Sequence, residues 1–477
     1  MTRGIFLTLA MCLAATGESP CGMCHPSQAA GFARTPMGRS LTPAMIEATA
    51  SFAHKASGGR LSVSPDGLRI EQGGLSATYP AVWQIGSGNH AAGFLTTIGG
   101  QLFQAPIAYY PRRNLWDVAP GYESLPHIDF NRRVTGECLF CHTGLSSQLT
   151  PITCERCHGE AEPHSLRPAK GNVVNPAKLA AAERAAVCEQ CHLSGEARIA
   201  QPGRRVEDFR PGRKLEDYLA IFVSTAVGSE IKVVSHAEQL AQSKCAQRSP
   251  QLWCGTCHKV HGETVNISRT CQGCHPARAA GHPRTDAECA SCHMPKRDAV
   301  DGLHTTFTDH RVRRPGRAVV SEVAPGLRAW RAGPNAERNL GLALMAAGER
   351  AGSEAYLQQS FRTLSAAYPN HPRDPELLTA LGSLLFLKDQ YADAGKLFLA
   401  AIQYRPAYGP YRQKLAIVLK AQGQAESARA RLEEAIRLDP LDETNYHLLA
   451  DLTPERRREI LQRYLAIHPQ HLATRKR

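Results

Sequence analysis

The stretch Cys154-Glu155-Arg156-Cys157-His158 carries a pattern, Cys-x-x-Cys-His, that recurs along the first two-thirds of the chain. It occurs seven times and uses 14 of the 16 cysteines. Two thiols one helical turn apart can bond the two vinyl groups of a haem, and the adjacent imidazole then lies under the iron. The pattern therefore predicts seven covalently attached haem c groups. The attachment cysteines would be Cys21, Cys24, Cys138, Cys141, Cys154, Cys157, Cys188, Cys191, Cys254, Cys257, Cys271, Cys274, Cys289 and Cys292, and the proximal ligands His25, His142, His158, His192, His258, His275 and His293.

Two other kinds of site use the same cysteine spacing. Two Cys-x-x-Cys pairs close together, such as Cys138/Cys141 and Cys154/Cys157, are typical of a zinc ribbon, and an even cysteine count is typical of a disulfide framework. Neither alternative explains why a histidine follows the second cysteine in all seven copies. The haem interpretation is therefore preferred.

Candidate distal ligands come from the histidines outside the motifs. Nine of them lie before the C-terminal region, which is enough to supply a sixth ligand to each of seven irons and favours bis-histidine sites. His127 and His282 are the less favoured members, Met37 is a possible thioether ligand, and Cys245 is left over as an odd cysteine. The predicted distal metal ligands are His54, His90, His164, His236, His261, His304 and His310.

The N-terminus resembles an export signal. Arg3 precedes an apolar run from Ile5 to Ala15, and the small residues that follow place a cleavage site after Gly17. Residues 1–17 are thus a predicted signal peptide, and the periplasm of a bacterium is the expected compartment. Cys12 offers a lipoprotein anchor as an alternative, and no stretch is long and apolar enough to predict a transmembrane segment.

The formal charge of +13 raises the question of nucleic-acid binding. Fourteen haem propionates would offset much of this basic excess, and no nucleic-acid recognition motif occurs in the sequence. Nucleic acid is therefore not an expected partner.

Residues 18–310 form the expected seven-haem cytochrome domain, rich in loops and short helices. A small β-rich insert is predicted at about 55–115, because Pro65-Asp66-Gly67 and Gly99-Gly100 are hairpin turns between alternating apolar runs. The motifs after Cys138 are separated by short links, which leave room only for short helices and turns. Residues 311–334 are a predicted basic linker.

Residues 335–477 contain no cysteine and repeat with a period of 34 residues. Leu381, Gly382, Ala394, Phe398, Ala401 and Pro406 match Leu415, Ala416, Ala428, Leu432, Ala435 and Pro440, at the offsets typical of a tetratricopeptide repeat. An upstream copy is partial, and the last copy, which ends at Pro469, is shortened. This region is therefore predicted to be an all-α tetratricopeptide-repeat domain, whose stacked helix pairs would dock a protein partner.

Several short motifs together resemble those of bacterial multihaem c-type cytochromes of the cytochrome c-554 type that carry a tetratricopeptide tail. They are Cys154-Glu-Arg-Cys-His-Gly with His164, Cys289-Ala-Ser-Cys-His-Met-Pro-Lys296, Trp116-Asp-Val-Ala-Pro-Gly-Tyr122, Gly86-Ser-Gly-Asn-His90 and Thr308-Asp-His310. The resemblance spans almost the whole chain. It implies an exported electron-transfer protein and supports His90, His164 and His310 as ligands. Octahaem hydroxylamine oxidoreductases and pentahaem nitrite reductases are related by haem packing, but the Cys-x-x-Cys-Lys motif of the nitrite reductases does not occur here.

Three functions follow as hypotheses. The first is an electron carrier with seven six-coordinate haems, whose repeats dock a redox partner. The second is a haem-dependent oxidoreductase that binds a small nitrogen or sulfur compound at one open haem. The third is a repeat-based scaffold that assembles a respiratory complex. The surplus of histidines favours a carrier over an enzyme.

Overall fold

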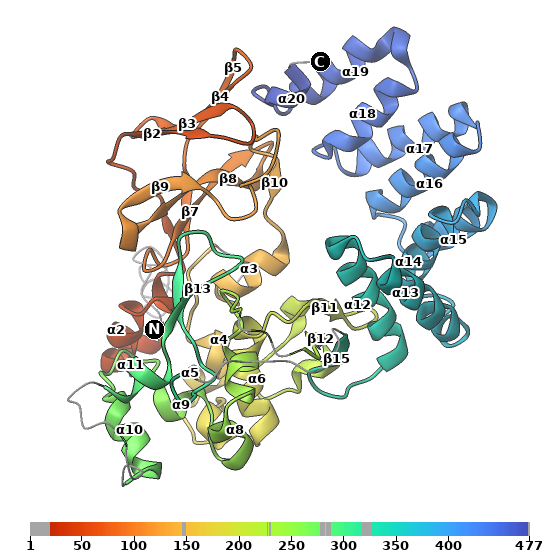
Figure 1. Ribbon diagram of the computed structural model, residues 1–477. Helices are drawn as coiled ribbons and strands as arrows, with labels where there is room; N and C mark the ends of the chain where they lie inside the picture. Colours follow the sequence, from red (N-terminus) through yellow and green to blue (C-terminus); the bar gives the residue numbers. More distant parts are fainter. Residues whose placement is uncertain are drawn as a thin grey trace, which may run out of the picture.

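Antiparallel strands dominate the chain between Leu41 and Arg133 in the computed structural model (Figure 1). The structure describes residues 20–145, 149–226, 228, 230–276, 282, 288–316 and 326–475. The predicted signal peptide lies outside these residues. Within the described ranges, no helix combines the length and the apolar character needed to span a membrane.

Two antiparallel sheets share the first core. One has the order β1-β6-β7-β8-β10, with β9 paired to β8, and the other the order β2-β3-β4-β5. Their buried faces meet around Leu61, Ile70, Phe94, Ile107 and Phe130. The strands are β1 (Leu41–Pro43), β2 (Ala50–His54), β3 (Gly59–Ser64), β4 (Gly67–Gln72), β5 (Leu75–Tyr79), β6 (Trp83–Ile85), β7 (Ala92–Ile98), β8 (Gln101–Tyr110), β9 (Leu115–Val118) and β10 (Arg132–Arg133).

Both predicted hairpins are confirmed. Pro65 and Asp66 connect Ser64 of β3 to Gly67 of β4, and Gly99 and Gly100, with φ +55° and +78°, join β7 to β8. In the second turn, positive φ at both central residues suits the twist of an antiparallel hairpin, and glycine reaches it without steric cost. The strands nevertheless extend well beyond the expected limits of about 55–115. The expectation of a loop-rich cytochrome domain with a small insert is wrong here, because this part of the chain is β-rich.

The rest of the chain before the repeats consists of short helices and two small sheets. The helices, of which α2 precedes the N-terminal strands, carry most of the Cys-x-x-Cys-His motifs. The helices are α2 (Pro26–Ala33), α3 (Gly136–His142), α4 (Glu155–His158), α5 (Glu162–Leu166), α6 (Ala181–His192), α7 (His236–Ala241), α8 (Lys244–Arg248), α9 (Cys254–Cys257), α10 (Ile267–Cys274) and α11 (Cys289–His293). The sheets are β11 (Ala197–Ala200), β12 (Leu219–Ser224) and β15 (Leu327–Ala329), and β13 (Lys296–Asp298) with β14 (Thr306–Thr308). Strand β15 falls inside the expected linker, where it pairs with β12. We call the described residues before Asn335 the body.

The remaining chain is a stack of antiparallel helix pairs, which we call the array (Figure 1). The predicted repeat positions, including Leu381, Ala394, Leu415 and Ala428, are buried between the helices. The prediction of an all-helical repeat region is confirmed, and its last pair is short as expected. The helices are α12 (Ala336–Ala351), α13 (Glu354–Ala367), α14 (Pro375–Phe386), α15 (Tyr391–Tyr404), α16 (Gly409–Ala421), α17 (Ala425–Leu438), α18 (Glu443–Asp451), α19 (Arg457–Leu465) and α20 (Leu472–Arg475).

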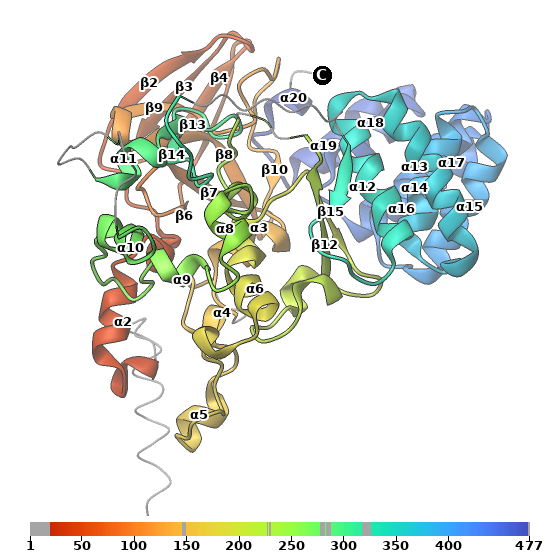
Figure 2. The same ribbon diagram turned by 60° about the horizontal axis from the view of Figure 1, so that its bottom comes forward.

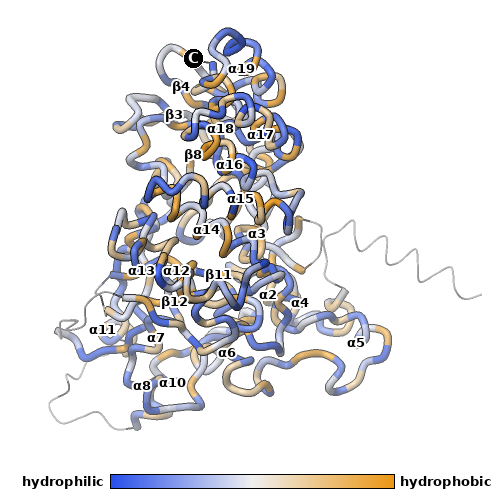
Figure 3. Tube along the Cα trace, turned by 90° about the vertical axis from the view of Figure 1, so that its right-hand side faces the viewer, coloured by the Kyte–Doolittle hydropathy of each residue, from blue (hydrophilic) through white to orange (hydrophobic). Residues whose placement is uncertain are grey.

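Capping residues fix where several of these helices begin and end. The side chains of Ser353, Asp374 and Asp442 accept hydrogen bonds from backbone N–H groups in the first turns of α13, α14 and α18. Gly352 ends α12 with φ +60°, a left-handed conformation that favours glycine. Figure 3 shows apolar and polar segments alternating along the array, as expected for amphipathic helices.

Both ends of the array contact the body. Helix α12 packs on β11, β12 and β15, where Phe222 and Ala343 share a small apolar core. At the far end Leu441, Ile467 and Leu472 pack against the core of the two N-terminal sheets. Figures 1 and 2 both show α20 beside the strands of the N-terminal half. The chain therefore closes on itself, with the middle of the array spanning between two anchors.

Candidate functional site

The motif cysteines and histidines lie on single helical turns. The first motif occupies a 3₁₀ turn (Pro20–Met23) that leads into α2, and the others lie on or at the ends of α3, α4, α6, α9, α10 and α11. In several copies the N–H of the motif histidine donates to the carbonyl of the first cysteine, for example His158 to Cys154 and His258 to Cys254, both at 2.9 Å. This bond places the imidazole directly after the turn that carries the two thiols.

Motif histidines face histidines from elsewhere in the chain. The rings of His158 and His261 are 13° from parallel, with centroids 6.1 Å apart. Three further pairs share this arrangement, with angles of 20–26° and centroids 6.0–6.4 Å apart. They are His25 with His164, His258 with His310, and His293 with His282.

Three of the predicted distal ligands belong to these pairs. The structure places His164, His261 and His310 opposite motif histidines. His282 was outside the predicted set because its sequence context gave no signal, yet it faces His293. The motif residues His142, His192 and His275 are not among these pairs.

A cluster of imidazoles surrounds His236 at the start of α7. Its ring lies edge-on to His192, at 5.3 Å between centroids, and to His310, at 4.8 Å. Burial is the largest cause of a fall in the pKa of His236 to about 3, and the neighbouring imidazoles add to it. Burial likewise lowers the pKa of His192, His258 and His310. The cluster is therefore neutral near pH 7 and offers nitrogen lone pairs.

Three imidazole nitrogens of the predicted ligands are buried without a hydrogen-bond partner among the described residues. They are Nδ1 of His90, Nδ1 of His142 and Nδ1 of His236. His90 stacks on Phe307, with 4.1 Å between centroids, and Phe307 is also edge-on to His236. Such buried and unsatisfied nitrogens are uncommon, and they often mark a functional site.

Two predicted ligands lie apart from the motif histidines. Both ring nitrogens of His54 are engaged, by the hydroxyl of Ser57 at 2.7 Å and the carbonyl of Glu123 at 3.1 Å. His304 contacts the carboxylate of Asp117 at 2.8 Å between Nε2 and Oδ2. The first set of contacts ties the end of β2 to a later loop of the N-terminal sheets, and the second ties the segment between β13 and β14 to β9.

Thiols from different motifs also meet, which the sequence pattern did not indicate. Cys141 and Cys191 are hydrogen bonded, and this contact is the main reason that the pKa of Cys141 falls to about 7 while that of Cys191 rises. Cys188 and Cys254 form a second such pair. A shared proton explains the opposite directions within each pair, because the thiolate of one cysteine accepts from the thiol of the other.

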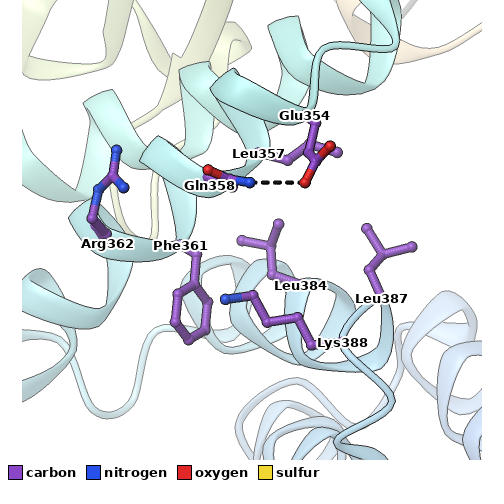
Figure 4. A pocket seen from close by; sticks show the side chains of 8 residues that line it. All are labelled: Glu354, Leu357, Gln358, Phe361, Arg362, Leu384, Leu387 and Lys388. Carbon is purple, nitrogen blue, oxygen red and sulfur yellow. Dashed lines mark hydrogen bonds between the residues drawn. The ribbon is translucent and has the colours of Figure 1, made fainter.

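The array carries a separate surface feature, a groove between α13 and the end of α14 of about 280 Å³ (Figure 4). Its apolar lining is Leu357, Phe361, Leu384 and Leu387, and its polar lining is Glu354, Gln358, Arg362 and Lys388. The ammonium of Lys388 lies 3.9 Å from the centre of the Phe361 ring. In the sequence, the apolar run from Leu384 to Leu387 followed by Lys388 could have indicated this groove. It was interpreted only as part of the tetratricopeptide repeat.

Comparisons with known proteins give partial likenesses. No family model matches the chain. BBSome complex member BBS4 of Bos taurus is 35% identical over 94 residues, which are 19% of this chain and 18% of that protein. The chain thus covers less than a fifth of this relative.

Solved structures match over a similarly limited part. The crystal structure of the MamA protein has a TM-score of 0.25 and 18% identity, over 29% of this chain and 75% of that one. A mutant O-GlcNAc transferase of Thermobaculum terrenum has a TM-score of 0.26 and 22% identity, over 28% of this chain and 27% of that one.

These findings overturn the cytochrome assignment. Among the described residues, no three or more His, Cys, Asp or Glu side chains are grouped so that they could hold a metal ion. No family model of a cytochrome matches the chain either. We therefore withdraw the multihaem resemblance, the seven haem c groups, the electron-carrier function and the haem-dependent oxidoreductase alternative.

Proposed function

We propose that this chain is a repeat-based interaction scaffold, in which the array holds a partner protein close to the cysteine- and histidine-rich body. The observation that carries this proposal is the attachment of the array at both of its ends. An array fixed in this way presents the surface between its anchors in one orientation. Stacked helix pairs form extended surfaces that suit protein segments.

The first anchor is a buried polar network. Arg338, at the start of α12, is 1% exposed, and its Nη1 donates to the carbonyl of Ala200 in β11 at 2.6 Å. The side-chain amides of Asn335 and Asn339 donate to Oε1 of Gln201 at 3.0 and 3.1 Å. This anchor fixes the first helix of the array on the three-stranded sheet.

The second anchor joins α20 to the N-terminal strands. The side-chain amide of Gln470 accepts from the N–H of Thr78 and donates to its carbonyl, both at 2.7 Å. The carboxylate of Asp129 accepts from the backbone N–H groups of Leu472 and Ala473 at the start of α20. These side-chain-to-backbone hydrogen bonds hold the end of the array against the body.

Between the anchors the array exposes large apolar side chains. Leu387 is 62% exposed and Leu399 is 54% exposed. Tyr368, Tyr404, Tyr408 and Leu438 are also exposed. These side chains are distributed along the array from Tyr368 to Leu438, and they are apolar surface that a protein partner can cover.

Site-specific photo-crosslinking tests the scaffold. A photoreactive amino acid at Leu399 of the full-length chain, expressed in its native host, should capture one partner reproducibly. The same amino acid at Leu166, an exposed leucine of α5 in the body, serves as the matched control. Capture at both positions alike, or at neither, would contradict the proposal. The captured protein would also show whether the partner belongs to a respiratory complex or is a redox protein, which are the narrower forms of this proposal.

A second candidate function concerns the predicted site residues. We propose that the facing histidines and the motif cysteines bind a metal-containing group, to which the protein contributes two imidazoles rather than three or more side chains. An imidazole nitrogen lies about 2.0 Å from a metal ion, so two imidazoles on opposite sides of one ion have centroids about 6 Å apart. The four facing pairs, at 6.0–6.4 Å, support this proposal.

Metal analysis of protein isolated from the native host tests this candidate. The replacement His164→Leu should lower the metal content by one equivalent relative to the wild type. The replacement His371→Leu, in the array and remote from every facing pair, is the control. Metal-free wild-type protein, or equal loss in both variants, would refute it.

We propose that residues 18–310 form the ligand-binding part, that 311–334 connect it to the array, and that the chain is exported to the periplasm. Export is supported by the apolar run from Ile5 to Ala15, which lies outside the described residues. Amino-terminal sequencing of the mature protein would test cleavage after Gly17.

A further inference from the structure

The groove between α13 and the end of α14 combines an apolar floor with a cationic end. Leu357, Leu384 and Leu387 line the floor, and Leu387 keeps most of its surface exposed. Figure 4 shows the ammonium of Lys388 directed towards the Phe361 ring at one end, with Glu354 and Gln358 joined by a hydrogen bond of 2.8 Å at the other. The groove therefore has a basic side chain at one end and an acidic side chain at the other.

The cations at this end are not neutralised by the chain itself. Among the ion pairs formed by described residues, neither Arg362 nor Lys388 takes part. Lys396, one helix further on, pairs with Asp393 at 2.8 Å, and Arg405 pairs with Glu376 at 3.0 Å. The two groove cations, like several other basic residues of the array, form no ion pair within the described part of the chain and are available to an incoming anion.

The position of Lys388 over an aromatic ring leaves N–H groups for an incoming acceptor. An ammonium held against a ring face by a cation–π contact still has donors that point away from the ring. A carboxylate placed there would bond Lys388 directly. The neighbouring apolar side chain of the partner would cover Leu387, the exposed leucine of the floor.

We infer that this groove binds an acidic segment of the partner protein, in which an apolar side chain is followed closely by carboxylates. The inference rests on the proposed scaffold function and names the chemistry of the partner at one place on the array. The floor supplies affinity through apolar burial, and the two cations select the direction and sign of the segment. A basic segment of the same shape would be rejected by like charge.

Peptide binding to the full-length protein tests this inference. The probe is a fluorescein-labelled peptide, Gly-Ser-Leu-Asp-Glu-Asp-Gly-Ser, and its counterpart has lysine at the three acidic positions. Fluorescence anisotropy should show saturable binding of the acidic probe alone. Binding should weaken as salt rises, because exposed charges are screened. Equal binding of both peptides, or no saturation of the acidic probe below about 1 mM, would overturn the inference.

Variants locate the site. Lys388→Glu should weaken binding of the acidic probe at least tenfold, and Leu387→Ser should weaken it several-fold. Leu166→Ser, which replaces an exposed leucine of α5 in the body, is the control and should leave binding unchanged. Circular dichroism establishes that each variant is folded. Equal effects of Lys388→Glu and Leu166→Ser would overturn the inference.

The same variants separate this inference from the scaffold proposal. If crosslinking at Leu399 captures a partner that binds Lys388→Glu as tightly as the wild type, the scaffold stands and the groove assignment falls. If no partner is captured while the acidic probe still binds, the scaffold falls and the groove remains a peptide site.

Discussion

The guanidinium of Arg133 donates hydrogen bonds of 2.6 and 2.8 Å to the two carboxylate oxygens of Asp439, 306 positions later in the chain. Arg133 ends β10 and Asp439 follows α17, so the bond joins the first sheet to the third helix pair. Both side chains are about a quarter to a third exposed, at 31% and 25%. This two-pronged contact helps to close the array onto the body.

Replacing Arg133 with Ala should loosen this closure without unfolding either part. A partly exposed ion pair contributes about 1 kcal/mol, and the paired geometry places it near the upper end of the range for surface pairs. We expect faster amide hydrogen exchange in α18–α20, measured by mass spectrometry, with α12–α15 unaffected.

The matched control is Arg69→Ala, which removes an exposed ion pair to Glu71 on the neighbouring hairpin strand β4. It should leave exchange in α18–α20 at the wild-type rate. Identical protection of these helices in both variants would show that Arg133 does not hold the array.

Acidification should weaken the contact between the end of the array and the N-terminal sheets, because it favours protonation of the buried His468. Its side chain is fully buried, its Nδ1 is hydrogen bonded to the hydroxyl of Tyr464 at 3.0 Å, and its Nε2 has no partner among the described residues. Its pKa is lowered to about 3, mainly by burial and in part by the neighbouring His471, while Glu443 opposes this shift.

The direction of the pH effect follows from this shift. The unfolded chain takes up a proton on His468 near its ordinary pKa of about 6.5, whereas the folded chain does not. The free energy of unfolding should therefore fall as the pH drops from about 6.5 to about 3, by up to about 1.4 kcal/mol per unit. Urea titrations at several pH values measure this slope. In His468→Phe the slope should be shallower, and an unchanged slope would count against His468 as its source.

Local patterns in the sequence were sufficient to predict the array and the two hairpins. The 34-residue period located Leu381 and Leu415 in the helix interfaces, and the paired glycines located the turn between β7 and β8. Both are short-range signals, in which residues close in sequence determine one turn or one helix face.

Contacts between distant segments could not be predicted in the same way. Nothing near Asp129 or Arg133 indicates that residues more than 300 positions away will bind them. The same limit applies to the facing histidines, since His282 was passed over while His54, which the sequence favoured, lies among the N-terminal strands. A histidine's neighbours are set by the packing of the whole body, which sequence spacing does not encode.

The buried pair of Arg338 and Asp374 should be sensitive to the loss of either partner. Nε of Arg338 lies 2.8 Å from Oδ2 of Asp374, and the guanidinium also donates to the carbonyl of Ala200. In Arg338→Leu the carboxylate of Asp374 stays buried without its counter-ion, which typically costs about 3–5 kcal/mol. Thermal unfolding followed by circular dichroism should show a large loss.

The double variant Arg338→Leu/Asp374→Asn provides the control for this pair. Because it removes the uncompensated charge, it should recover part of the lost stability. A double variant less stable than Arg338→Leu would show that Asp374 stabilises the array mainly by capping α14 through the N–H of Leu377.

Two glycines inside helices of the array should respond in opposite ways to replacement by alanine. A Cβ at Gly382 in α14 would lie 2.8 Å from the buried Phe398 ring, closer than real contacts allow. A Cβ at Gly395 in α15 would lie 3.6 Å from Val418, an ordinary contact. Alanine favours a helix over glycine by about 1 kcal/mol at either site. Gly395→Ala should therefore raise the melting temperature, whereas Gly382→Ala should lower it because Phe398 must shift in a packed interface. Stabilisation by both replacements would contradict the close approach of α14 and α15 on which the repeat register depends.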